Sequence, residues 1–88
     1  MPFVVYILIN SNYQTYVGQT NNIMLRLERH NAGLVHSTVS GRPWYILFTE
    51  EYQTRSEAMK REKWLKSGIG REYIRAKVRS TIGPPSAD

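Results

Sequence analysis

The hydrophobic and polar positions divide the chain into segments with different periods. Residues 3–9 are apolar without a break, which is typical of a β-strand covered on both faces. The polar run 10–12 has the composition of a turn, and residues 13–20 predict a second strand. A three-residue loop places Tyr6 opposite Tyr16, whereas a two-residue loop shifts the pairing by one residue. The opening therefore predicts a hairpin that contains two tyrosines.

Helix signals and strand signals alternate through the rest of the chain. Asn21 or Asn22 can cap a first helix, and Gly33 is its C-terminal stop. Thr54 can cap a second helix, which Ser67 and the following glycine close. The other predicted segments are a polar loop (34–43), an apolar strand (44–52), the second helix (55–66) and a shorter basic helix (71–79).

The order β-β-α-β-α-α is typical of the α+β class, in which helices cover a small antiparallel sheet. A chain of 88 residues has room for one modest core. We therefore expect one domain over residues 1–79 and a disordered tail over residues 80–88.

Composition narrows the function classes. The chain has no cysteine, which excludes disulfides and thiolate metal sites and is compatible with a reducing cytoplasm, where we expect the protein. Its longest apolar run, 3–9, is far shorter than the roughly 20 residues of a membrane-spanning helix.

The net charge is +5, and residues 55–79 hold nine of the twelve Lys and Arg against three acids. This basic block indicates a polyanionic partner, although a solvated helix face has the same composition.

The first predicted helix carries two candidate functional side chains. Ile23 and Leu27 belong against the sheet, so Arg26 and His30 lie beside or within the buried edge. An arginine at such a boundary commonly buries its stem and keeps its head in water. That structural interpretation stays open beside a functional one.

Glu62 is a carboxylate on the inward face of the second predicted helix. Ala58, Met59 and Leu65 define that face, and Glu62 follows them at helical spacing. A buried carboxylate is costly unless it is paired or bound to a metal. The alternatives are an ion pair with Arg26 or with a lysine one turn away, or a metal ligand.

Gly18 interrupts the second predicted strand, where glycine marks a bulge or a close approach to the backbone. A cleft with two phenols, an arginine, a histidine and a carboxylate suits phosphodiester chemistry. The arginine stabilises charge on the phosphate, the carboxylate holds a hydrated Mg²⁺, and a phenol or the histidine assists water.

The motifs resemble those of the GIY-YIG nuclease family, which includes the catalytic domain of the repair nuclease UvrC. "VVY" at 4–6 and "YVG" at 16–18 resemble the paired motifs that give the family its name. The resemblance continues through "GQTNNIMLRLERHNAG" and "GRPWYILFTEEYQTRSEAMKREKWLKS". It covers residues 3–67, and it is greatest to the small single-domain bacterial branch.

The resemblance implies a three-stranded antiparallel sheet and a role for each matching residue. Tyr6 and Tyr16 surround the attacking water, and one of them is the general base. Gly18 closes the second motif, and Arg26 contacts the phosphate. His30 matches a histidine frequent in the single-domain branch.

Glu62 matches the glutamate that binds a single divalent metal, Mg²⁺ or Mn²⁺. Two positions depart from the pattern of some relatives. Gln19 stands where those relatives carry a lysine, and no asparagine follows Asn31 to act as a distal ligand. We expect no separate recognition domain beside the matching region.

The leading hypothesis is therefore a metal-dependent DNA endonuclease, with repair or recombination as its setting. RNA is an open alternative substrate, and a protein partner is expected to supply target recognition. The basic residues expected to contact the nucleic acid are Arg29, Lys60, Arg61, Lys63 and Lys66.

Two other hypotheses remain: a nucleic-acid-binding module that cleaves weakly or only with a partner, and a purely structural Arg26–Glu62 ion pair. The preferred DNA structure, the identity of the general base and the oligomeric state stay open.

Overall fold

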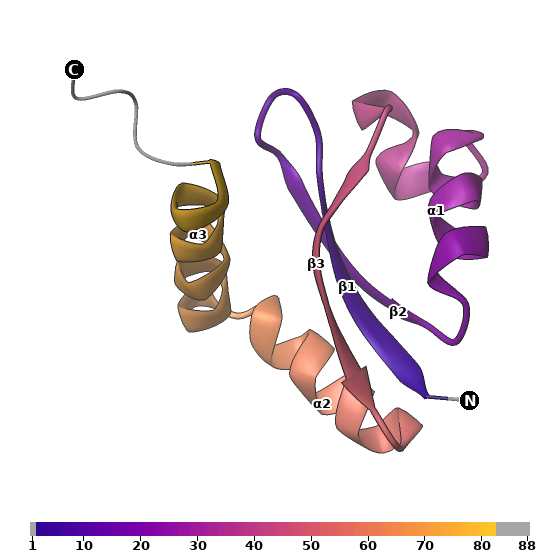
Figure 1. Cartoon of the computed structure of the whole chain (residues 1–88). Helices are drawn as coiled ribbons and strands as arrows, with labels where there is room; N and C mark the ends of the chain where they lie inside the picture. The colour runs from indigo at the N-terminus through magenta and orange to yellow at the C-terminus, as the bar shows by residue number, and fades with distance from the viewer. Residues whose placement is uncertain (1, 83–88) are drawn as a thin grey trace.

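The computed structural model describes residues 2–82, which form three strands, three α-helices and one 3-10 helix (Figure 1). In chain order the elements are β1 Phe3–Ile9, β2 Thr15–Thr20, α1 Ile23–Asn31, η1 His36–Gly41 (the 3-10 helix), β3 Tyr45–Tyr52, α2 Arg55–Leu65 and α3 Gly68–Ile82. No helix among these residues is long and apolar enough to cross a membrane.

The strands form one antiparallel sheet in the order β2-β1-β3, as predicted for the fold class. The α1 and η1 helices lie on one side of the sheet, and α2 and α3 lie on the other (Figure 1). Because β1 is central and both its faces are covered, residues 4–8 are all buried. This burial explains why the strand is apolar without alternation.

The register of the hairpin differs from the predicted one. Tyr6 pairs with Gly18, and Tyr16 pairs with Leu8. The loop is longer than predicted because the Asn10 side-chain oxygen accepts the backbone N–H groups of Asn12 (3.1 Å) and Gln14 (2.9 Å). A shift of two residues preserves the side on which a strand residue projects, so both tyrosines still lie on the α1 face.

Helix ends follow the predicted signals closely. Asn22 caps α1 by accepting the N–H of Leu25 at 3.2 Å, and Gly33 beyond the helix adopts a positive φ of 80°. Thr54 and Glu57 form a reciprocal capping box at the start of α2. The predicted 34–43 loop contains η1, which its polar composition did not reveal.

Two predictions in the second half are corrected. Met59 is 52% exposed, whereas Ala58 and Leu65 are fully buried, because Met59 lies about 100° further round α2 than Ala58. The basic helix is also longer than predicted, since α3 begins at Gly68 and continues to Ile82. The predicted tail therefore begins within a helix, and its remainder, residues 83–88, lies outside the described residues.

The sheet separates two hydrophobic clusters, one on each face. On the α2 and α3 side, Val5, Ile7 and Val17 pack with residues from both helices. On the α1 side, Tyr6 and Leu8 belong to a cluster that also contains Val4 and Trp44, with Tyr16, Ile23 and Leu27 packed against it. The candidate site grows out of this second cluster, where polar side chains replace part of the apolar packing.

Candidate active site

Four side chains form a continuous hydrogen-bonded chain on the α1 face. The Tyr6 hydroxyl accepts the Nε–H of Arg26 at 3.3 Å and lies 2.9 Å from His30 Nε2. On the other side of the ring, His30 Nδ1 lies 2.8 Å from the hydroxyl of Thr38. Tyr6 is 1% exposed and His30 and Thr38 are equally inaccessible, so the chain connects half-buried Arg26 to the interior of the domain.

The hydrogen-bond partners define which atom donates and which accepts in each of these bonds. Thr38 donates its hydroxyl hydrogen to the carbonyl of Val35 at 3.3 Å, so it accepts from His30 Nδ1–H. Neutral His30 then presents an unprotonated Nε2 to the Tyr6 O–H, while Tyr6 accepts from Arg26. In this arrangement every buried polar group has a partner.

The pKa shifts favour the same protonation states. Burial raises the pKa of Tyr6 against the lowering effect of Arg26, so Tyr6 remains a neutral phenol. Burial, with a further contribution from Arg26, lowers the pKa of His30, which keeps the imidazole neutral at neutral pH. The hydrogen bond to Tyr6 raises the pKa of Arg26, which therefore remains a cation.

Tyr16 is the more accessible of the two tyrosines. Its ring centroid lies 6.3 Å from that of Tyr6 and 5.0 Å from the His30 ring, and its side chain is only partly buried. Tyr16 is also close enough to Arg26 to contribute to the raised pKa of that guanidinium. Tyr16 can therefore meet solvent or substrate beside Arg26, whereas Tyr6 is enclosed.

Gly18 makes room for the Tyr6 ring. A Cβ at this position would lie 2.6 Å from Tyr6 Cζ and 3.1 Å from Tyr16 Cε2, and it would also clash with the Tyr6 hydroxyl. The close approach that the glycine predicted is thus real, but the approaching group is a tyrosine on the neighbouring strand.

Glu62 lies across the sheet from the four-residue chain. It projects from α2 and accepts from Gln19 Nε2 (3.0 Å) and from Lys66 Nζ (2.7 Å). Gln19 belongs to the edge strand β2, so Glu62 reaches the rim of the sheet on which Gly18 and Tyr16 also lie. Its charge is near enough to contribute to the raised pKa of Tyr6.

This placement decides between the two ion pairs predicted for Glu62. The pair with Lys66 is formed, and the pair with Arg26 is not, because the two side chains start from opposite sides of the sheet and Arg26 is bound to Tyr6. The Arg26–Glu62 ion pair that the purely structural hypothesis requires is therefore not formed, whereas the pair with a lysine one turn away is.

One carboxylate at this rim fits a hydrated Mg²⁺, which commonly takes one or two carboxylates plus water and phosphate oxygens. Glu62 retains lone pairs beyond its two hydrogen bonds, and Lys66, whose side chain is 53% exposed, can move away. Within residues 2–82 no group of three or more His, Cys, Asp or Glu residues forms an all-protein metal site. The donor set therefore suits a metal that shares its coordination with substrate.

The basic residues predicted to contact nucleic acid are placed differently from one another. Arg29, Lys60 and Lys63 are exposed. Arg61 makes a bidentate pair with Glu50 (2.8 and 3.0 Å), and its Cζ lies 4.5 Å from the centroid of the Trp64 ring. Arg61 is therefore occupied in packing.

Thr38 and Gln19 were not identified from the sequence pattern as parts of the site. Thr38 lies in the polar 34–43 segment, where nothing distinguishes it from the neighbouring serines. Gln19 was noted only as a missing positive charge, and its bond to Glu62 depends on the sheet edge that β2 forms.

Comparison with known proteins agrees with the fold and identifies the family. The GIY-YIG catalytic domain family matches residues 2–73, and the chain belongs to this family. Among its relatives are the Staphylococcus aureus UPF0213 proteins SAV0488 and SA0446, each 35% identical over 72 residues that cover 81% of this chain and 88% of the relative.

A similar solved structure is the solution NMR structure of the UPF0213 protein BH0048 from Bacillus halodurans. It is 28% identical, and the match covers 86% of this chain and 84% of that chain with a TM-score of 0.53. The three-stranded antiparallel α+β fold predicted from the motifs is confirmed, as is membership of a nuclease family.

Proposed function

We propose that this protein is a divalent-metal-dependent endonuclease that hydrolyses phosphodiester bonds in DNA. The observation that carries the proposal is the bond from Arg26 Nε to the Tyr6 hydroxyl. It holds a cationic guanidinium at the rim of the site and leaves the two terminal nitrogens for a phosphate. An arginine fixed in this way stabilises the charge that develops on the phosphate oxygens.

The two tyrosines have different roles in this proposal. Tyr16 is partly exposed and near Arg26, so its hydroxyl oxygen can accept a hydrogen bond from the attacking water. The water oxygen bonds to phosphorus as the bond to one ester oxygen breaks. The attacking water gives up one proton to the solvent, and the leaving oxygen takes up one proton from the solvent. Tyr6 and His30 are positioning residues, since both are buried and they act by fixing Arg26.

Glu62 is the residue that would hold the metal ion, with Gln19 fixing the orientation of the carboxylate. When bound there, a divalent ion supplies Lewis-acid stabilisation of the phosphate oxygens. Lys66 pairs with the same carboxylate, so its ammonium would be free to contact the nucleic-acid backbone when Glu62 holds an ion.

Cleavage of a panel of labelled DNA tests this proposal. Blunt duplex, flapped, branched and single-stranded molecules are incubated with Mg²⁺ and either the wild type, Glu62→Gln or Glu51→Gln. Glu51 is an exposed glutamate on β3 and controls for the loss of one negative charge. The proposal predicts cleavage by the wild type and by Glu51→Gln but not by Glu62→Gln. Full activity of Glu62→Gln would refute the metal assignment.

A nucleic-acid-binding module with weak or partner-dependent cleavage is the second candidate. The 2.7 Å bond from Lys66 to Glu62 favours it, because this ammonium competes with a metal ion for the carboxylate. Salt-sensitive binding of the panel without cleavage would support this candidate. RNA versions of the same molecules distinguish the two possible substrates.

A further inference from the structure

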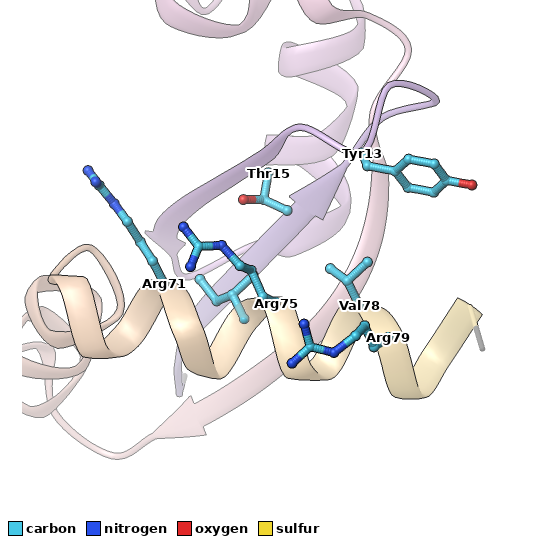
Figure 2. Close-up of a pocket in the computed structure, with 7 residues that line it drawn as sticks. Tyr13, Thr15, Arg71, Arg75, Val78 and Arg79 are labelled. Carbon is cyan, nitrogen blue, oxygen red and sulfur yellow. The ribbon is translucent and has the colours of Figure 1, made fainter. Parts of the chain in front are cut away.

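A basic groove lies between α3 and the β1–β2 hairpin, on the opposite side of the sheet from Tyr6 and His30 (Figure 2). Its volume is about 400 Å³, and its lining includes Arg71, Arg75 and Arg79 of α3. Spacing of four residues places the three side chains along one stripe, with about 6 Å of helix rise between neighbours. Figure 2 shows the three arginines leaving α3 in a row, with Arg75 reaching from the helix towards Thr15.

The charges of this arginine stripe are not neutralised within the described part of the chain. The ion pairs found among residues 2–82 join Arg61 to Glu50 and Lys66 to Glu62, and neither involves the stripe. Three exposed guanidinium groups in a row repel one another, and an anionic partner would relieve this repulsion. A partner with regularly spaced negative charges fits best.

The groove continues towards the candidate active site. A second hollow shares Thr15, Arg71 and Ile74 with the groove, and its lining also includes Tyr16 and Lys66. Lys66 in turn borders a hollow that contains Glu62. Basic side chains therefore line the surface from Glu62 to the arginine stripe, past the edge strand that also carries Tyr16.

An exposed aromatic ring borders the far end of the groove. Tyr13, at the tip of the hairpin, is 64% exposed and has a φ of 61°, in the left-handed region that glycine adopts more easily. Asn10 holds this turn, since its carbonyl accepts the N–H of Tyr13 at 3.0 Å and its side chain binds the backbone of Gln14. The turn thus holds a large apolar ring in water, in a conformation that glycine would adopt more easily.

We propose that this groove binds a single-stranded segment of the nucleic acid as it leaves the active site. Arg71, Arg75 and Arg79 contact successive phosphates, and a base stacks on Tyr13. Combined positive grooves and exposed aromatic rings are the usual means of binding single strands. The identity of the ligand as the strand being cleaved rests on the proposed endonuclease function, whereas the groove itself rests on the contacts described above.

A single strand fits this surface better than a continuous duplex. Half-buried Val78, beside the buried Ile74, gives the groove a small apolar floor, which suits the face of an unpaired base. In a duplex those faces are stacked within the helix and are not available to Tyr13. The proposed substrate class is therefore DNA with a single-stranded extension next to the duplex that is cut.

Binding measurements without cleavage test the proposal. Fluorescence anisotropy in EDTA compares a labelled DNA hairpin with the same hairpin carrying a 3′ or a 5′ single-stranded extension. The proteins are the full-length wild type, R71Q/R75Q, Tyr13→Leu and Tyr13→Phe. Arg55→Gln is the charge control, because Arg55 lies at the start of α2 and lines neither the groove nor the hollow that continues it.

We expect one of the extensions to strengthen binding by the wild type. R71Q/R75Q should lose this gain, and its slope of log K against log salt should fall by about 1.4, since each single-strand phosphate contact contributes about 0.7. Tyr13→Leu should weaken binding of the extended hairpin roughly 5- to 150-fold, the range that base stacking supplies. Tyr13→Phe keeps the ring and should bind as the wild type does.

Equal affinity for the plain and extended hairpins would overturn the proposal, as would an extension gain that R71Q/R75Q retains to the same extent as Arg55→Gln. Cleavage assays with Mg²⁺ then separate the two proposals. Cleavage by the wild type, combined with either of those results, leaves the endonuclease standing and removes the groove. An extension gain that depends on the stripe and Tyr13 but is accompanied by no cleavage supports the groove and contradicts the endonuclease.

Discussion

The hydroxyl oxygen of Tyr6 and Nε2 of His30 lie 2.9 Å apart between the central strand of the sheet and α1. This bond joins residues 24 positions apart, and a second bond joins the same hydroxyl to Arg26. The tyrosine of the first motif is thus a structural link that also orients the charged group of the site. Stability and function are therefore coupled at this position.

Tyr6→Phe should destabilise the protein. The substitution keeps the ring but leaves His30 Nε2 buried without a partner, which costs about 1–3 kcal/mol of unfolding free energy. Urea unfolding measures the change. Tyr13→Phe, which removes an exposed hydroxyl, should change stability by less than about 0.5 kcal/mol. Equal effects of the two variants would contradict the role given to the Tyr6–His30 bond.

The stability of the protein should fall as the pH drops below about 6.5, the ordinary pKa of histidine. Burial and Arg26 lower the pKa of His30 in the folded state, so the unfolded chain binds a proton more readily in this range. Stability from this group is fully present above that pH and is lost towards the lower pKa of the folded state. Urea unfolding as a function of pH checks the trend.

His30→Gln should reduce that pH dependence, because the substitution removes the buried imidazole. The readout is the slope of unfolding free energy against pH, which a general loss of packing would not alter. An identical slope in the wild type and in His30→Gln would show that another group titrates.

Gly18→Ala should destabilise the protein by about 1–3 kcal/mol. The added methyl group would lie 2.6 Å from Tyr6 Cζ and 3.1 Å from Tyr16 Cε2. Both rings pack on the α1 face, which limits how far they can move. Gly68→Ala is the matched control, because nothing lies within 4 Å of a Cβ at that position. Thermal unfolding of the two variants should differ clearly, and a tolerant Gly18→Ala would contradict this packing.

Arg61→Gln should affect stability more than nucleic-acid affinity. Arg61 pairs with Glu50 and packs over Trp64 and Tyr73, so its loss should cost about 1 kcal/mol of unfolding free energy. Lys63→Gln, which removes an exposed charge, should lower nucleic-acid affinity more than it lowers stability. Urea unfolding and anisotropy measurements on both variants test the contrast, which would fail if Arg61→Gln lost as much affinity as Lys63→Gln.

The fold could be predicted because its signals are local. The apolar β1, the cap residues Asn22 and Thr54, and the stop at Gly33 each act within a few residues of their own position. The hairpin register could not be predicted in the same way. It depends on the Asn10 side chain, which accepts the backbone N–H groups of Asn12 and Gln14. Several types of turn are compatible with the same polar residues.

The site was predictable only in part, for a related reason. Helical spacing placed Arg26 and His30 at the buried edge of α1, but it carried no information on Thr38, which η1 brings to the other side of the imidazole. Glu62 was expected on the inward face of its helix, and its side chain is 20% exposed. Its position across the sheet from Tyr6 follows from the third strand and the path of α2, which no local pattern contains.

We propose that Glu62 recruits a metal ion to a site organised by Arg26 and Tyr16. The most direct measurement is the single-turnover cleavage rate of one DNA substrate as Mg²⁺ is titrated, for the wild type and Glu62→Gln in parallel. The account predicts a rate that rises with Mg²⁺ and saturates in the wild type, is abolished by EDTA, and is absent in Glu62→Gln. Cleavage that persists in EDTA, or an identical Mg²⁺ titration for the two proteins, would contradict it.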